Sequence, residues 1–180
     1  MLFTYEDFQE IDPDHDDPMM ITVEIVEYAV MKTLVDQGSS VDILFWDTLK
    51  RLHLREEDIV PFREQIIDFS CERVSTKGYI DLETTFGRGG KTKKIKIRHL
   101  VVDACSSYNV LLGRSSLNKL GAIVSTPHLA MKFPTEKGEI ATIYVNQRDA
   151  WECYAAGLKM NLKKVKILKK WWKWWIWIQG

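Results

Sequence analysis

Short apolar runs separated by turn residues cover most of the chain, and their pattern predicts a fold built mainly of β-strands. Apolar side chains alternate at Ile21, Val23 and Ile25, within a β-rich segment from Ile21 to Met31, as in a strand with one buried face. Similar runs predict further strands at residues 32–36, 66–69, 79–82, 95–102, 123–124, 129–133 and 140–145, and residues 108–113 predict a turn that leads into an apolar strand ending in Gly. The cluster Gly87-Arg88-Gly89-Gly90 separates two of these strands and predicts a hairpin or a loop.

Two segments have the spacing of short helices. Residues 45–52 carry apolar side chains at helical intervals and predict the first of them. Residues 115–120 predict the second, with Ser115 or Ser116 as its N-cap and Gly121 at its C-terminal end.

A longer helix is expected over residues 146–159. One side of it would carry Trp151, Tyr154, Ala155 and Leu158. Many short strands with few helices are typical of a small closed β-barrel or a sandwich. At 180 residues the chain is most simply one domain, 19–158, between an acidic entry segment, 1–18, and a basic tail, 159–180.

Charge is distributed unevenly, although the net charge is zero. Residues 1–30 hold nine Asp and Glu and no Lys or Arg, whereas residues 159–180 hold seven Lys and no acid. Lys93, Lys94, Lys96 and Arg98 flank alternating isoleucines. We expect this basic run to be a solvated outer face, not a nucleic-acid patch, because charge runs are usually surface.

The three cysteines are Cys71, Cys105 and Cys153, and no Cys-x-x-Cys pair exists. Neither a zinc site nor a disulfide framework is therefore expected. The N-terminus is acidic and lacks a signal-peptide pattern, which predicts an intracellular, cytoplasmic protein with reduced thiols. No run of about 20 apolar residues exists, so no conventional membrane span is expected.

The tail from residue 159 has an unusual composition, with five of the seven tryptophans. If it were helical, one face would carry Lys163, Lys166, Lys170 and Lys173, and another Val165, Leu168, Trp172 and Trp175. Such a helix could lie on an anionic membrane surface or promote association. The abrupt change in composition favours a different interpretation, a shifted reading frame or a wrongly drawn gene end.

One acid stands at the end of an apolar run, in Leu34-Val35-Asp36-Gln37-Gly38-Ser39-Ser40. A carboxylate at the end of a buried strand is unfavourable unless it is hydrogen-bonded or has a chemical role. Taken alone, the tripeptide Asp-x-Gly is common, and an acid that only caps a turn would be the simpler interpretation. The flanking apolar strand and the distant Leu111-Leu112-Gly113 favour a functional role for Asp36.

Several motifs follow one another in the order found in a known family. They are His15-Asp16-Asp17-Pro18, Leu34 to Leu44, Tyr108 to Arg114, Leu117 to Thr126, Leu129 to Pro134, and Cys153-Tyr154. With them, residues 15–158 closely resemble the retropepsin-like aspartic protease region of plant gypsy-type LTR retrotransposon polyproteins. The resemblance implies a mainly β fold, a retropepsin-like closed β-barrel with short helices.

The resemblance also implies an aspartic endopeptidase in which Asp36 is catalytic. The chain has a single Asp-x-Gly, so a homodimer would have to supply the second carboxylate, about 3 Å from the first. Two acids this close share one proton. The neutral acid would polarise the substrate carbonyl while the charged one takes a proton from the attacking water. The implied substrate is the element's own polyprotein or a peptide, within the cytoplasm or virus-like particles, and no cofactor or metal is expected.

By the same resemblance, the residues that support Asp36 would be Gln37, Gly38, Ser39, Leu111, Leu112 and Gly113. Gly38 would allow a tight turn and bond the carboxylate through its N–H, and Ser39 would supply an outer hydroxyl. The segment from Ile67 to Gly78 would be the flap that closes over substrate.

Three features depart from the family. Gln37 stands where a Thr or Ser normally hydrogen-bonds across the dimer, and its side chain is longer than either. Asp68 and Cys71 occupy flap positions where glycine is usual, and Ser115 stands where proline is common. These departures leave open a catalytically inactive dimerisation domain of a degraded retrotransposon, and the tail leaves open a membrane-interacting protein.

Two other groups of residues carry less weight. The acidic segment from Asp12 to Asp17 lacks the Gly and Glu that a calcium loop needs at its sixth and twelfth positions, so a solvated turn is expected. His53, His99 and His128 have no nucleophile motif near them, which leaves a serine or cysteine hydrolase without support.

Overall fold

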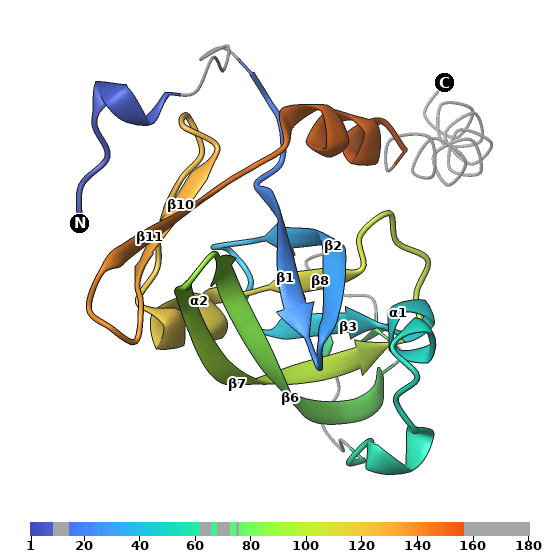
Figure 1. Cartoon of the computed structure of the whole chain (residues 1–180). Helices are drawn as coiled ribbons and strands as arrows, with labels where there is room; N and C mark the ends of the chain where they lie inside the picture. Colours follow the sequence, from blue (N-terminus) through green and yellow to red (C-terminus); the bar gives the residue numbers. More distant parts are fainter. Residues whose placement is uncertain (9–14, 62–65, 68–72, 75, 157–180) are drawn as a thin grey trace, which may run out of the picture.

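A closed barrel of six strands forms the centre of the molecule, in the order β1-β2-β8-β3-β7-β6 (Figure 1). The computed structural model describes residues 1–8, 15–61, 66–67, 73–74 and 76–156. The barrel strands are β1 (Met20–Ile25), β2 (Tyr28–Val35), β3 (Asp42–Phe45), β6 (Thr76–Arg88), β7 (Lys91–Val102) and β8 (Val110–Leu112). The expectation of a mainly β barrel with short helices is confirmed, and the barrel is closed.

The first hairpin of the barrel turns at Val26 and Glu27, whose φ angles are 47° and 69°. Two central residues with positive φ match the twist of the flanking strands. Neither Gly nor Asn marks this turn, which is why the sequence predicted one β-rich segment as far as Met31. That expectation was wrong, because β1 ends at Ile25 and β2 extends from Tyr28 to Val35, next to Asp36, with an irregularity at Lys32.

The long hairpin β6–β7 turns at Gly89 and Gly90, which have φ angles of 61° and 84°. The predicted hairpin is therefore confirmed. Its outer face carries cross-strand ion pairs between Arg98 and Asp81 and between Lys94 and Glu83. These pairs lie on the solvated face that the basic run predicted.

Both predicted short helices are present, α1 (Trp46–Arg51) and α2 (Arg114–Leu120), with 3₁₀ turns at Tyr5–Asp7 and Glu56–Asp58. Gly121 ends α2 with a φ of 70°, as expected. The expectation of a serine N-cap was wrong, because the N-cap residue is Gly113, which has no side chain to form a capping bond. Ser115 instead donates its hydroxyl to Asp42, and Ser116 is buried.

A second, antiparallel sheet packs beside the barrel in the order β11-β10-β9 (Figure 1). Its strands are β9 (Ile123–Ser125), β10 (Ala130–Pro134) and β11 (Ile140–Tyr144). The start of the chain contacts this sheet, since Lys132 of β10 forms an ion pair of 2.7 Å with Asp7 and the rings of Phe3 and Phe8 contact His128. This hydrogen-bonded ammonium holds the pKa of the Asp7 carboxyl below its usual range.

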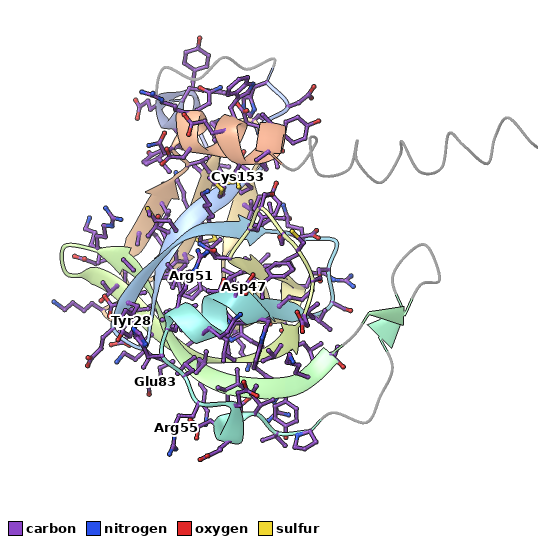
Figure 2. The ribbon with its side chains drawn as sticks, turned by 90° about the vertical axis from the view of Figure 1, so that its right-hand side faces the viewer. Tyr28, Asp47, Arg51, Arg55, Glu83 and Cys153 are labelled. Carbon is purple, nitrogen blue, oxygen red and sulfur yellow. The ribbon has the colours of Figure 1, made fainter. Side chains whose placement is uncertain are left out.

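A helix over residues 147–156 lies across one end of the molecule, and Cys153 points from it toward the barrel (Figure 2). Asn146 caps its first turn through the N–H of Asp149. Its buried side chains are Ala150 and Cys153, whereas Trp151 is 61% exposed. The expectation that Trp151 and Tyr154 would share the buried face of this helix was wrong, because the smaller Ala150 and Cys153 are buried instead. Leu158 and the expected end of the helix at Lys159 lie outside the described residues.

Two short strands, β4 (Ile66–Ile67) and β5 (Arg73–Val74), pair antiparallel beyond the barrel. They belong to the segment predicted as a flap, but Asp68 and Cys71 lie outside the described residues. At the base of this segment, a Cβ on Gly78 would stand 2.3 Å from the Val60 oxygen, so the chain passes too closely for a larger residue. The tail from residue 157 is also outside the described part of the chain, and the prediction for it stays a prediction.

Candidate active site

Asp36 directly follows β2, at the end of a buried parallel ladder. β2 pairs with β8, and the last pair joins Val35 to Leu112. The N–H of Asp36 extends the ladder by donating to the Leu112 oxygen at 2.9 Å. Because Val35 and Leu112 are both buried, the ladder fixes the backbone at the point where the acid begins.

The turn after Asp36 binds one of its carboxylate oxygens. The N–H of Gly38 donates to Oδ1 at 2.8 Å, as the family resemblance implied. Oδ2 has no hydrogen-bond partner among the described residues, and the side chain is half-buried. Gln37 is exposed, and the Ser39 hydroxyl donates to the Val41 oxygen at 2.8 Å, so it stabilises the turn without reaching the carboxylate.

A second acid, Asp42, joins this loop to the start of α2. It is only 2% exposed, at the first position of β3. Its two carboxylate oxygens accept the Gly113 N–H at 2.8 Å and the Ser115 hydroxyl at 2.5 Å. Sequence reasoning missed this residue, although an acid followed directly by the apolar run Ile43 to Phe45 signals a buried carboxylate that needs donors.

The same two segments also approach each other through their backbones. The Arg114 N–H donates to the Ser39 oxygen at 2.9 Å. A Cβ on Gly113 would lie 2.4 Å from the Val41 oxygen, closer than real Cβ atoms come. Gly113 is therefore required by contact distance, since its φ of −93° is open to any residue.

Asn109 fixes the strand that leads to Asp36. Its side-chain amide donates to the Met31 oxygen at 2.8 Å, and its N–H donates to the Lys32 oxygen at 3.0 Å. Lys32 has a φ of 57°, and the register of β2 against β1 shifts there, so these bonds hold an irregular part of the strand. The Thr48 hydroxyl of α1 donates to the same side chain at 3.3 Å. Asn109 belongs to one of the family motifs in the sequence, but its position in the motif did not indicate this role.

The predicted support residues therefore gather around Asp36. Gly38 and Ser39 form the turn after it. Leu112 accepts the Asp36 N–H, and Gly113 donates to Asp42 at the end of the same loop. Leu111 lies in β8 opposite Leu34 of β2 and Ile43 of β3. Their catalytic importance stays a prediction.

His99 lies inside the barrel beside Asp42, its register partner on the neighbouring strand β3. The side chain is fully buried, and neither ring nitrogen has a hydrogen-bond partner among the described residues. Burial lowers the pKa of His99 from 6.5 to about 4, although the charges of Asp42 and Asp81 oppose this shift. A backbone contact with Ile97 also favours the charged ring, but it does not meet hydrogen-bond geometry.

We expect this histidine to limit stability in acid. Between pH 6.5 and about 4 the unfolded chain binds a proton at His99 that the folded chain does not, so stability falls as pH falls through this window. The loss should approach about 3 kcal/mol, at roughly 1.4 kcal/mol per pKa unit. Urea unfolding at several pH values should show that His99→Leu removes most of this dependence.

Thr84→Val is a matched control, because Thr84 is also buried in the barrel with an unpartnered polar atom but does not titrate. Its effect should be the same across the pH range. An acid loss in His99→Leu as large as that of the natural chain would contradict the assignment to His99.

Neither a metal site nor a membrane-spanning helix emerges from the described residues. Within them, no three His, Cys, Asp or Glu side chains form a group that could hold a metal ion. No helix in the same part of the chain is long and apolar enough to cross a membrane. Asp12 and Asp14, of the acidic segment considered as a metal cluster, lie outside that part.

Comparison with solved structures identifies the fold. The retroviral protease-like domain of Ddi1 from Leishmania major superposes with a TM-score of 0.56 and 14% identity, over 72% of this chain and 94% of that domain. The EIAV protease complexed with the inhibitor HBY-793 has a TM-score of 0.47 and 23% identity, over 64% of this chain and 99% of that protein. A retropepsin-like aspartic protease from Rickettsia conorii has a TM-score of 0.44 and 16% identity, with coverages of 69% and 81%.

No family model and no curated protein sequence matches the chain. The superposition on the Ddi1 domain shows that this chain has a retropepsin-like aspartic protease fold, which confirms the fold expected from the resemblance. At 14% identity the likeness concerns the fold alone.

Proposed function

We propose that this protein is an aspartic endopeptidase that works as a two-fold homodimer, with one Asp36 from each copy. The observation that carries the proposal is the state of the Asp36 carboxylate. Oδ1 accepts the Gly38 N–H at 2.8 Å, whereas Oδ2 has no partner among the described residues. A fixed, half-buried acid with one unengaged oxygen is suited to bind a water or to share a proton with a second acid.

The chemistry would divide between the two acids. One Asp36 would be neutral and donate a hydrogen bond to the scissile carbonyl, while the charged one takes a proton from the attacking water. The Gly38 N–H on each side would hold the carboxylates in place during the proton transfer.

The substrate in this proposal is an extended polypeptide cut between apolar residues, most simply the polyprotein of a retroelement in the cytoplasm. Gln37 is exposed on the protomer, beside Asp36. In the dimer its amide would take the place of the hydroxyl of the usual Thr or Ser, because an amide can both donate and accept. Asp36 and its turn would remain the reacting unit.

Cleavage of an unfolded protein substrate at about pH 5 tests the proposal. The purified natural chain should cleave it, and Asp36→Asn should lower the rate by at least about 100-fold, because the amide cannot take the proton from water. Asp47→Asn is the matched control, since Asp47 lies exposed on α1 (Figure 2). It should cleave at the natural rate.

Equal background cleavage by the natural chain and Asp36→Asn would sink the enzyme proposal and favour an inactive dimerisation domain. In that case Gln37→Thr shows whether the central residue of the turn is responsible, because a gain of cleavage would implicate it.

A further inference from the structure

A groove of about 760 Å³ opens between the barrel and the second sheet, and Asp36 is not among the residues that line it. Its walls come from β1, β2, the β6–β7 turn, β11 and the helix over 147–156. In Figure 1, β11 rises toward this helix, β1 descends from beneath it, and the turn between β6 and β7 lies below. Nothing in the proposed proteolytic mechanism uses this groove.

One wall is the edge of β11 that pairs with no strand among the described residues. In an antiparallel pair, every second residue of a strand forms hydrogen bonds with the partner strand, and the residues between them point their N–H and C=O groups the other way. The Thr135 N–H donates to the Glu139 oxygen, and the Val145 N–H donates to the Leu129 oxygen. These two bonds show which residues of β11 face β10. Ala141 and Ile143 therefore bond to β10. The N–H and C=O groups of Thr142 and Tyr144 point away from β10, toward the groove they line.

The opposite wall is also an unpaired strand edge. β1 pairs with β6 only at Glu24 and Ile25, so the first residues of β1 have no strand on that side within the part of the chain that the structure describes. The Val35 N–H donates to the Met19 oxygen, so Met19 faces β2. Because successive residues of a strand face opposite sides, the N–H and C=O of Met20 point away from β2, and Met20 lines the groove. Two strand edges thus border one groove, and β1 and β11 do not pair with each other.

The charge along the groove is polarised. Lys32, Arg88 and Lys91 line it and form no ion pair among the described residues. Arg88 and Lys91 lie at the end of the groove near Ala141. This placement follows because their neighbour Gly87 lies close to the Phe133 ring, and Phe133 is the strand partner of Ala141. Asp149 and Glu152 line the other end, toward which β11 runs.

We propose that this groove binds an extended peptide segment of a partner protein by strand addition to β11, with acidic side chains over Arg88 and Lys91. Main-chain hydrogen bonds to Thr142 and Tyr144 give the affinity of such a contact, and side chains set its direction. The segment runs antiparallel to β11, as the strands of this sheet already do. Its C-terminal half is acidic and its N-terminal half, near Asp149, is basic.

The test is fluorescence anisotropy at neutral pH with the full chain and a fluorescein-labelled heptapeptide. The peptide alternates valine with lysine in its N-terminal half and with glutamate in its C-terminal half; mass spectrometry checks that it stays intact. A peptide with the two halves exchanged is the control for charge direction. We expect the first peptide to bind at least about tenfold more tightly than the second.

Thr142→Pro removes one unpaired N–H and leaves the β10–β11 bonds intact, because that N–H does not face β10. It should weaken peptide binding at least about tenfold, whereas Thr142→Val, which keeps the N–H, should not. The double variant Arg88→Glu with Lys91→Glu should abolish the preference between the two peptides, because both ends of the groove are then acidic. Circular dichroism confirms that each variant is folded.

Three results would overturn the proposal. They are equal binding of the two peptides, no loss in Thr142→Pro, and no binding at about 1 mM peptide. A change from dimer to monomer in the Arg88→Glu and Lys91→Glu variant, without peptide binding by the natural chain, would assign the groove to a contact between copies. Because no step depends on Asp36, loss of cleavage and loss of peptide binding are separate outcomes.

Discussion

Replacing Asp42 by alanine should lower the free energy of unfolding by about 3 kcal/mol and should slow the cleavage of substrate by the protein. The carboxylate accepts the buried Gly113 N–H and the Ser115 hydroxyl, and its removal leaves the Gly113 N–H without a partner, whereas Ser115 is exposed and can turn to water. A buried donor left unsatisfied costs about 1–3 kcal/mol. The loop from Asp36 to Asp42 would also lose its link to the start of α2. Urea unfolding and the cleavage assay measure the two effects.

Two control variants separate the cause. Asp42→Asn keeps an oxygen for the Gly113 N–H, and its amide can donate to Ser115, so we expect less than half of the loss. Asp81→Ala removes an acid whose pKa is lowered by its hydrogen bond with Arg98, but this pair lies on the outer face. Surface pairs contribute about 0–1 kcal/mol. An Asp42→Ala variant no less stable than Asp81→Ala would contradict the proposed role of Asp42.

Gly113→Ala should destabilise the protein by about 3 kcal/mol, at the upper end of overpacking effects. The new Cβ would meet the Val41 oxygen at 2.4 Å and the Ser39 oxygen at 2.9 Å, both from the loop that carries Asp36. Relief of this clash requires the loop to move away, which would break the Arg114 to Ser39 hydrogen bond. Thermal unfolding together with the cleavage assay checks both consequences.

Gly89→Ala is the complementary control. Gly89 has a φ of 61°, but nothing lies within 4 Å of a Cβ built there. Its replacement should cost about 1 kcal/mol from backbone conformation alone and should leave cleavage unchanged. A Gly113→Ala protein as stable and as active as Gly89→Ala would show that the close approach is not required.

The parts of the site that lie along the chain were predictable from sequence. An apolar strand, an acid and a glycine stand together at Val35, Asp36 and Gly38, and local chemistry alone fixes the bond from the Gly38 N–H. Support of Asp36 by Leu112 was expected from the family resemblance, but the strand pairing that provides it was not. Its register is set by the barrel, which joins segments more than seventy residues apart.

Tertiary contacts decided what the sequence did not predict. Serine is a common N-cap residue, but the Ser115 hydroxyl donates to the carboxylate of Asp42, in β3, instead of capping α2. His99 was an isolated residue in the sequence, and only the closure of the barrel buries it beside Asp42. Trp151 was expected on an apolar face, yet the buried side chains of its helix are the smaller Ala150 and Cys153.

His99 also bears on the conditions under which the proposed enzyme works. A shared-proton dyad favours mildly acidic solution. Stability falls in the same range, because the pKa of the buried His99 lies at about 4. His99→Leu should therefore extend the cleavage of substrate to lower pH, if cleavage requires the folded dimer.

The most direct measurement of the central claim, that two copies of Asp36 form one site, is the cleavage rate of mixtures of the natural chain and Asp36→Asn. Total protein is held constant, above the concentration at which dimers form, and subunits are allowed to exchange. If each site needs Asp36 from both copies, only dimers of two natural chains are active, and an equal mixture should retain about a quarter of the rate. Retention of about half, with a linear fall as the variant is added, would show that each chain acts alone and would contradict the account.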